Sequence, residues 1–167
     1  MHGNRPHTGS ATKISDLVEL GATFDDQETV EKIPHRNPMR IPPYYQNLID
    51  WDDPDDPIRK MSVPSALEDI GDGELDTSGE STNTKIRSLQ HKYSETALIL
   101  STHECAMYCR FCFRKRLVGR EGDETIGQGD FDKNIKYIHD HPEITNVLIS
   151  GGDPFTLKPQ RRPVLAS

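Results

Sequence analysis

The pattern of apolar residues predicts only short helices near the start of the chain. The first is indicated by apolar residues at helical spacing, namely Ile14, Leu17 and Val18. Asp25 and Asp26 can cap a second short helix, which we expect to end before Pro34 because proline does not continue a helix. Residues 1–12 are polar and have no periodicity, so they predict a disordered arm.

Prolines dominate the next segment. Seven of them fall between residues 33 and 64 and exclude a long helix or a central strand there. The aromatic residues of positions 44–51 are expected to pin this segment to a core by packing. Residues 65–93 are polar and rich in Gly, Ser and Thr, which indicates an ordered loop or linker. We therefore expect residues 13–93 to form a helical and proline-rich wrapping segment.

The second half of the chain has the pattern of an α/β unit. Residues 96–102 and 146–150 are short apolar runs that suit buried parallel strands. A helix between them is predicted by an apolar stripe at i, i+4 and i+7, formed by Phe131, Ile135 and Ile138. Asp130 or Asp132 can cap this helix, which should stop at His141. Strand, loop, helix and strand make a βαβ unit, and such units bind ligands where the strands end at their carboxyl edge.

Composition and charge narrow the class of protein. Of 167 residues, 33% are hydrophobic, and 27 acidic against 20 basic residues give a net charge of −7. This balance argues against a general nucleic-acid binder, which needs clustered Lys and Arg. No run approaches the roughly 18 apolar residues of a membrane span, and the start does not resemble a signal peptide. We expect a soluble, cytoplasmic protein that binds neither nucleic acid nor membranes.

All three cysteines of the chain, Cys105, Cys109 and Cys112, fall in one short window directly after the first predicted strand. Such packing is typical of metal binding and not of a disulfide framework. Three thiolates at this spacing can each ligate a different iron of a cubane iron–sulfur cluster and leave the fourth iron open. Zinc is the alternative, with His103 or His91 as a fourth ligand.

Two further patterns surround this window. The second predicted strand leads into Gly151-Gly152-Asp153, which by itself is typical of a tight turn between strand and helix. The second pattern is a run of basic residues, namely Arg110, Arg114, Lys115, Arg116 and Arg120. Such a run indicates either a solvent-exposed face or cations that stabilise nearby thiolates.

The sequence around the cysteines resembles that of the radical S-adenosylmethionine enzymes and, among them, the lysine 2,3-aminomutase family. The resemblance rests on Cys105-x3-Cys109-x2-Cys112 with Phe111 directly before the last cysteine. Similar blocks occur in the same order at residues 53–60, 90–93, 105–119 and 147–154, within a stretch from about residue 42 to residue 155.

The resemblance implies an α/β fold that is an incomplete radical S-adenosylmethionine barrel. Residues 94–157 would form about two of six βα units of a partial (β/α) barrel, preceded by the proline-rich, mostly irregular or short-helical extension. Residues 158–167 would be an irregular tail. Because the later strands of the family are missing, we expect an amino-terminal fragment that is not active alone.

The resemblance also implies site residues. Cys105, Cys109 and Cys112 would hold a [4Fe-4S] cluster whose open iron is chelated by S-adenosylmethionine. Phe111 would lie beside the adenine. The methionine amino group would be received by Gly151, Gly152 and Asp153. Glycines without side chains allow a close approach, and a carboxylate accepts hydrogen bonds from an ammonium. Arg114 would pair with the carboxylate of the substrate, for which arginine geometry is well suited.

The implied activity is that of an isomerase. An external electron donor of the flavodoxin or ferredoxin type would reduce the cluster, and a 5′-deoxyadenosyl radical would start 1,2-amino migration on an amino acid. The family also uses pyridoxal 5′-phosphate, but no lysine of this chain stands in a matching context for it. The substrate could be lysine, glutamate or protein-bound lysine, and a homo-oligomer is compatible with the family. The alternatives are a zinc-binding structural or interaction module and a non-functional fragment.

Overall fold

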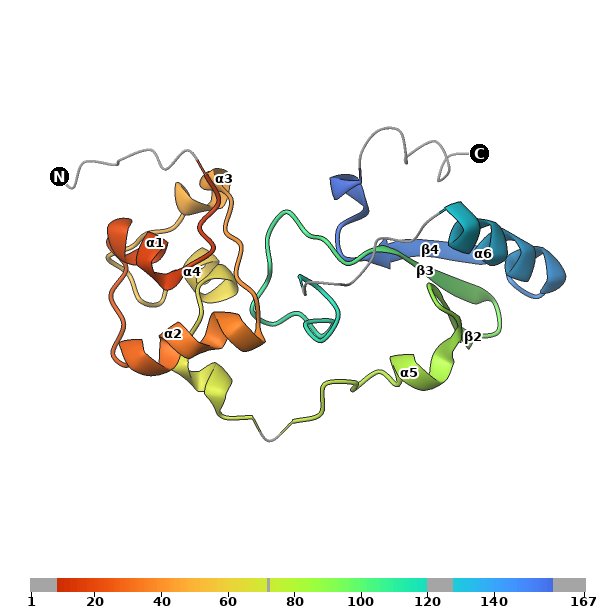
Figure 1. Cartoon of the computed structure of the whole chain (residues 1–167), viewed down its shortest axis with the longest axis horizontal. Helices are drawn as coiled ribbons and strands as arrows, with labels where there is room; N and C mark the ends of the chain where they lie inside the picture. Colours follow the sequence, from red (N-terminus) through yellow and green to blue (C-terminus); the bar gives the residue numbers. More distant parts are fainter. Residues whose placement is uncertain (1–8, 72, 120–127, 158–167) are drawn as a thin grey trace. The chain divides into compact units, whose positions relative to one another are not determined.

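The computed structural model describes residues 9–71, 73–119 and 128–157. The described residues fall into two compact units, each with its own elements (Figure 1). The first is formed from Met1–Gly73 and Ala106–Cys112, and the second from Glu74–Cys105 and Phe113–Ser167. The fold is a mixed α/β arrangement with one four-stranded sheet and several short helices. The boundary at Gly73 lies inside the segment expected to be a wrapping extension, and the domain division made from the sequence stays a prediction.

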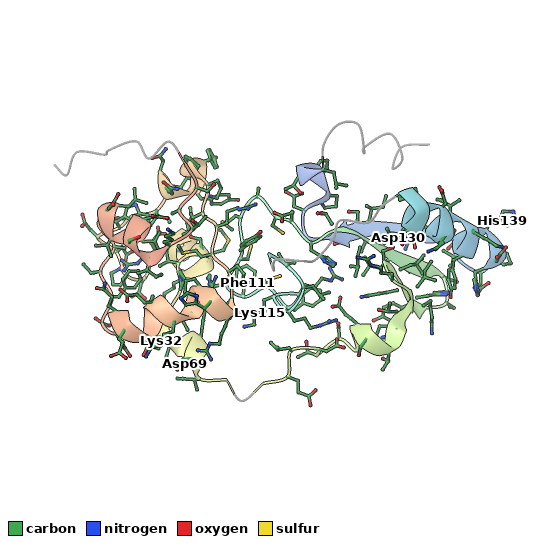
Figure 2. All side chains as sticks on the ribbon, in the orientation of Figure 1. Lys32, Asp69, Phe111, Lys115, Asp130 and His139 are labelled. Carbon is green, nitrogen blue, oxygen red and sulfur yellow. The ribbon has the colours of Figure 1, made fainter. Side chains whose placement is uncertain are left out.

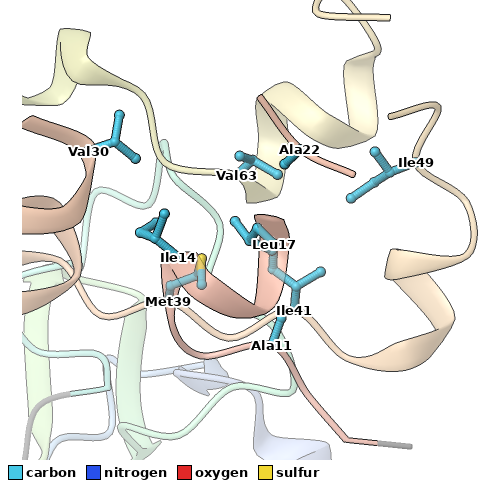
Figure 3. Close-up of a cluster of buried hydrophobic side chains, with 9 residues drawn as sticks. All are labelled: Ala11, Ile14, Leu17, Ala22, Val30, Met39, Ile41, Ile49 and Val63. Atoms are coloured by element: carbon cyan, nitrogen blue, oxygen red, sulfur yellow. The ribbon is translucent and has the colours of Figure 1, made fainter. Parts of the chain in front are cut away.

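The helices that the structure describes in the first unit are all short. They are α1 (Ile14–Glu19), α2 (Gln27–Arg36), α3 (Pro43–Gln46), α4 (Pro57–Ser62) and the 3-10 helix η1 (Ala66–Asp69). Their apolar faces meet in one core, in which Leu17 and Ile41 are completely buried (Figure 3). Both α3 and α4 begin at a proline, a position where the missing N–H is not needed. The prediction that the proline-rich segment forms no long helix is confirmed.

The predicted helices at the start of the chain are present, with one correction. Asp26 caps α2, because its side chain accepts a hydrogen bond of 3.0 Å from the Thr29 N–H. The helix then continues through Pro34 to Arg36, so the expectation that it ends before the proline is wrong. Pro34 lies in the last turn and removes one N–H donor there, but the Asn37 N–H still donates to the Ile33 carbonyl at 2.8 Å.

Part of the expected disordered arm is ordered. Ala11 is buried and exchanges two backbone hydrogen bonds of 2.9 Å with Ile41. Residues 1–8 lie outside the described residues. The aromatic residues behave mainly as predicted, since Tyr45 and Trp51 pack against the core, whereas Tyr44 is exposed.

The second unit is built on the sheet. Its strands are β1 (Thr84–Ile86), β2 (Leu89–Tyr93), β3 (Thr96–Thr102) and β4 (Asn146–Gly151), hydrogen-bonded in that order. β3 pairs antiparallel with β2 and parallel with β4. The remaining elements are α5 (Glu80–Asn83), α6 (Gln128–Asp140) and the 3-10 helix η2 (Pro154–Thr156). The predicted order of strand, helix and parallel strand is therefore confirmed by β3, α6 and β4.

The helix α6 differs from the prediction on its buried face. It is already formed at Gln128, so neither Asp130 nor Asp132 caps it, but it ends at Asp140 as expected. Ile135 is 52% exposed. Asn134 is completely buried instead and donates a hydrogen bond of 2.9 Å to the Ser88 hydroxyl.

Two further expectations about strands are corrected. The predicted loop of residues 65–93 contains β1 and β2, and Leu89 of β2 is completely buried in the sheet's apolar cluster. The prediction that β4 is buried is wrong, because β4 is the last strand in the order of this sheet and its Leu148 is 56% exposed.

Candidate metal centre

The three cysteines lie on the loop that follows β3 and carry thiols rather than disulfide bonds. All three are partly buried. Cys105 belongs to the second unit, whereas Cys109 and Cys112 belong to the first. Within the first unit a turn joins the last two, since the Cys112 N–H donates to the Cys109 carbonyl at 3.1 Å.

The electrostatics of this turn suit a cation. Burial raises the pKa of the Cys109 thiol, and the neighbouring Cys112 raises it further. Two thiolates side by side repel one another, and a bound metal ion removes both the repulsion and the cost of burying the charge. The residues present therefore fit a thiolate-ligated metal group.

Backbone hydrogen bonds fix the cysteine loop within the first unit. The Tyr108 N–H donates to the Arg40 carbonyl at 3.1 Å, and the Arg110 N–H donates to the Met61 carbonyl at 2.8 Å. The Arg40 guanidinium also lies 5.2 Å from the centre of the Tyr108 ring. The residues on both sides of Cys109 are thus held by segments that are distant in sequence.

Arg110 is the strongest of these attachments. Its side chain is only 7% exposed and makes a bidentate ion pair with Glu68, with Nε–Oε1 at 2.9 Å and Nη2–Oε2 at 2.6 Å. Its Nη1 donates to the Pro38 carbonyl at 2.9 Å. The interpretation of the basic run as a solvated face is wrong for Arg110, because this cation is buried and paired.

The glycine motif is attached to the start of the cysteine loop. A Cβ on Gly152 would lie 2.2 Å from the Glu104 carbonyl oxygen, and Gly151 has a φ of +109° and equally little room beside Thr102. The Gly152 N–H donates to the Thr102 carbonyl at 2.6 Å, and the Asp153 N–H to the Glu104 carbonyl at 2.7 Å. Only glycine allows this approach of β4 to the residues before Cys105.

Asp153 also ends the turn. Its Oδ1 accepts a hydrogen bond of 2.9 Å from the Phe155 N–H and caps η2. The interpretation of this motif as a turn between strand and helix, left open by the sequence, therefore describes the structure. Its role in holding an amino group stays a prediction.

Arg114 is held by a carboxylate that the sequence did not single out. Glu80 is buried, with a side chain only 4% exposed, and accepts from Arg114 Nε at 2.7 Å and from Arg116 Nη2 at 2.9 Å. Arg114 Nη1 also lies 3.4 Å from the Ser150 hydroxyl at the end of β4. The contact of Arg114 with a substrate carboxylate stays a prediction. Nothing in the sequence distinguishes Glu80, an acidic residue in a polar segment, as the partner of Arg114.

Phe111 is exposed and extends from the cysteine loop (Figure 2). It lines a cleft of about 700 Å³ in the first unit, together with Phe24, Leu67 and Arg110. An exposed aromatic ring in a cleft can stack on a planar ligand. The predicted place of Phe111 beside an adenine stays a prediction.

The comparisons with known proteins define the class first. Residues 95–166 match the family described as "4Fe-4S single cluster domain". This segment includes all three cysteines and the glycine motif. This match supports an iron–sulfur cluster and agrees with the thiol donors of the loop.

Curated proteins narrow the similarity further. The chain is 45% identical over 133 residues to a putative L-lysine 2,3-aminomutase of Aquifex aeolicus, covering 80% of this chain and 35% of the relative. It is 40% identical to the L-lysine 2,3-aminomutase of Clostridium subterminale (78% and 32% covered) and 36% identical to the glutamate 2,3-aminomutase of Clostridioides difficile (87% and 34% covered). By sequence the chain is similar to lysine and glutamate 2,3-aminomutases, which are isomerases of the radical S-adenosylmethionine family. It spans about a third of the length of these relatives.

In the part of the chain that the structure describes, the longest helix, α6, has 13 residues, and none is both long and apolar enough to cross a bilayer.

Proposed function

We propose that this chain provides the cluster-binding and cosubstrate-binding part of an aminomutase that moves an amino group between neighbouring carbons of an amino acid. The observation that carries the proposal is the attachment of the cysteine loop. Three thiols follow β3, and the glycine motif at the end of β4 is hydrogen-bonded to the same loop. In this proposal β3, α6 and β4 are the first part of a (β/α) barrel, with both motifs at the carboxyl ends of its strands.

Each residue has a proposed task. Cys105, Cys109 and Cys112 hold a [4Fe-4S] cluster and leave one iron open. The bound cluster supplies the electron that cleaves S-adenosylmethionine and so starts the radical reaction. Phe111 covers the adenine of that cosubstrate in the apolar cleft.

The glycine motif and Arg114 orient the two small molecules. Asp153 accepts a hydrogen bond from the methionine ammonium, for which one carboxylate oxygen is sufficient. Arg114 pairs with the carboxylate of the amino acid while Glu80 fixes its guanidinium plane. Pyridoxal 5′-phosphate and a donor of the flavodoxin or ferredoxin type complete the proposed reaction. Cysteines that stay reduced suit the cytoplasm.

Anaerobic reconstitution tests the proposal. We expect about four iron and four sulfide per chain, and loss of the cluster when any one of the cysteines is replaced by serine. Serine is the matched change because it keeps the volume of the side chain and removes the soft thiolate. Electron paramagnetic resonance of the reduced cluster should then change when S-adenosylmethionine is added.

The alternatives give different results in the same experiment. A zinc module would take up zinc in preference to iron and would stay colourless and insensitive to S-adenosylmethionine. A cluster whose spectrum is unchanged by S-adenosylmethionine would contradict an open iron site. Cysteine-to-serine variants that keep the full iron content would contradict the ligand assignment.

A further inference from the structure

A second group of metal-ligating side chains lies in the second unit. His91 is on β2, and His141 and Glu143 are in the turn between α6 and β4. Each of the three offers one ligand atom, and these atoms all lie within 4.8 Å of one another. Figure 2 shows His139 at the end of α6 that leads into this turn.

This group lies near the amino ends of β3 and β4, whereas the glycine motif lies at their carboxyl ends. Tyr93 of β2 pairs with Thr96, the first residue of β3, so His91 is near the amino end of β3. The turn that carries His141 leads directly into β4, where the Asn146 N–H donates to the Glu95 carbonyl at 3.1 Å. The glycine motif follows the carboxyl end of β4. We propose that His91, His141 and Glu143 bind a divalent transition-metal ion, for which Zn²⁺ is the best fit.

The hydrogen bonds of His91 prepare one of its ring nitrogens for a metal. Its Nε2 lies 3.1 Å from the Ser94 carbonyl oxygen. A carbonyl only accepts, so Nε2 carries the proton and the lone pair is on Nδ1. In the structure His91 Nδ1 lies 3.1 Å from the Tyr137 hydroxyl oxygen and can accept a hydrogen bond from it. A backbone carbonyl that fixes the far N–H is the usual support of a metal-ligating histidine.

His141 and Glu143 supply the other two donors. His141 Nδ1 lies 2.8 Å from Glu143 Oε1. The His141 ring stacks on Tyr137, with ring centres 4.1 Å apart, and the His91 ring meets it edge-on at 5.6 Å. Aromatic packing therefore limits the freedom of both imidazoles.

The donor set decides the class of ion. Two imidazole nitrogens and one carboxylate oxygen form a three-ligand zinc site that leaves a fourth position for water. Zinc–ligand bonds of about 2.0–2.1 Å require tetrahedral donor atoms to be closer together than 4.8 Å. Partial exposure of His141 and Glu143 leaves their side chains room for this small adjustment. The metal would replace the hydrogen bond between His141 and Glu143, and a neutral His141 would then carry its proton on Nε2 and offer the Nδ1 lone pair.

The thiols must be prevented from binding zinc in the test. We would use the full chain with Cys105, Cys109 and Cys112 replaced by serine, and separately the chain with its cluster assembled. Calorimetry with ZnCl2 should give one site with a Kd of about 10 µM or tighter in both. With Co²⁺, visible bands of tetrahedral nitrogen and oxygen ligation should appear without sulfur charge-transfer bands.

Variants separate the site from incidental binding. His141→Ala and Glu143→Gln, both at partly exposed positions of the turn, should each weaken zinc binding at least about tenfold and remove the Co²⁺ bands. The control is His139→Ala, because His139 is 88% exposed and lies outside the group. Circular dichroism shows whether each variant is folded.

The proposal is overturned if no site tighter than about 1 mM is found, or if His139→Ala weakens binding as much as His141→Ala. It is also overturned if Glu143→Gln and His141→Ala leave the affinity unchanged. The serine variant contains no cluster ligands, so its result is independent of the proposed aminomutase function.

Discussion

The buried ion pair between Arg110 and Glu68 gives the sharpest prediction about how the cysteine loop is held. Replacement of Arg110 by methionine keeps most of the apolar stem and removes the guanidinium. The change leaves the Glu68 carboxylate, whose side chain is 13% exposed, without its buried cation and the Pro38 carbonyl without its donor. The loss should therefore appear as a lower stability of the first unit.

The magnitude follows from the burial of the pair. Breaking a buried ion pair from one side costs about 3–5 kcal/mol, because the remaining charge is left uncompensated. Glu68 keeps hydrogen bonds from Asn37 Nδ2 at 3.3 Å and from the Ser65 N–H at 3.2 Å. We therefore expect the lower end of this range, about 3 kcal/mol.

Arg36→Met provides a matched control. Arg36 at the end of α2 pairs with Asp69 at the end of η1, but the two side chains are 58% and 48% exposed. An exposed pair of this kind contributes less than about 1 kcal/mol. The two variants thus remove the same chemical group beside the same 3-10 helix and differ in burial.

Urea unfolding under reducing conditions measures both variants. The fluorescence of Trp51, the only tryptophan of the chain, reports on the first unit because its ring packs against that core. Adding Glu68→Gln to the Arg110→Met variant should recover part of the stability, since no charge is then buried alone. Equal stability of Arg110→Met and Arg36→Met, within about 0.5 kcal/mol, would refute the reasoning.

Three further changes address the second unit. Gly152→Ala should lower the iron content after reconstitution, because the new Cβ would collide with the Glu104 carbonyl just before Cys105; an unchanged iron content would count against this. Asn134→Ala should lower the free energy of unfolding by about 1–3 kcal/mol in urea titrations, because it leaves the buried Ser88 hydroxyl without its partner. Hydrogen bonds from Ser81 lower the pKa of Asp76 to about 2. The ionised carboxylate therefore stabilises the fold above the unfolded pKa of about 3.9, and this stabilisation is lost as the pH falls toward 2. Asp76→Asn should therefore reduce the acid dependence of the urea midpoint, and an unchanged dependence would contradict the assignment.

The elements that could be predicted from the sequence are those with continuous apolar runs. The apolar residues of β3 are consecutive and buried, and of the α6 stripe Phe131 is buried and Ile138 packs against the sheet's apolar cluster. The predicted apolar stripe is wrong at Ile135, which is exposed. Asn134 is buried in its place and donates a hydrogen bond to the Ser88 hydroxyl, 46 residues away in the sequence. A polar residue in a core gives no periodic signal, because its burial depends on a partner from another part of the chain.

The strands β1 and β2 could not be predicted for a related reason. β2 has one completely buried apolar residue, Leu89, and then polar residues such as Gln90. Its place is determined by antiparallel pairing with β3, for example Leu89 with Ile99. Pairing between strands is a property of two segments together, whereas propensity is read from one.

At the candidate metal centre the cysteine spacing predicts the ligands but not the residues that hold the cysteine loop. Arg110 and Glu68 are 42 positions apart, and Arg114 and Glu80 are 34 apart. In each pair a charged residue that would ordinarily be exposed is buried because the other neutralises it. Single charges in polar segments do not indicate which of them will be paired, so both carboxylates were missed.

The geometry of the glycine motif changes what its glycines imply. In the sequence they suggest either a tight turn or a close approach by a ligand. In the structure the close approach is made by the chain itself, through the hydrogen bonds from Gly152 to Thr102 and from Asp153 to Glu104. The two interpretations are therefore compatible. The glycines set the position of the backbone that leads into Cys105, and the Asp153 carboxylate, with Oδ1 capping η2, can still accept from an ammonium. A side chain at Gly152 should thus disturb cluster assembly before it affects binding of the cosubstrate, whereas loss of the Asp153 charge should affect the cosubstrate first.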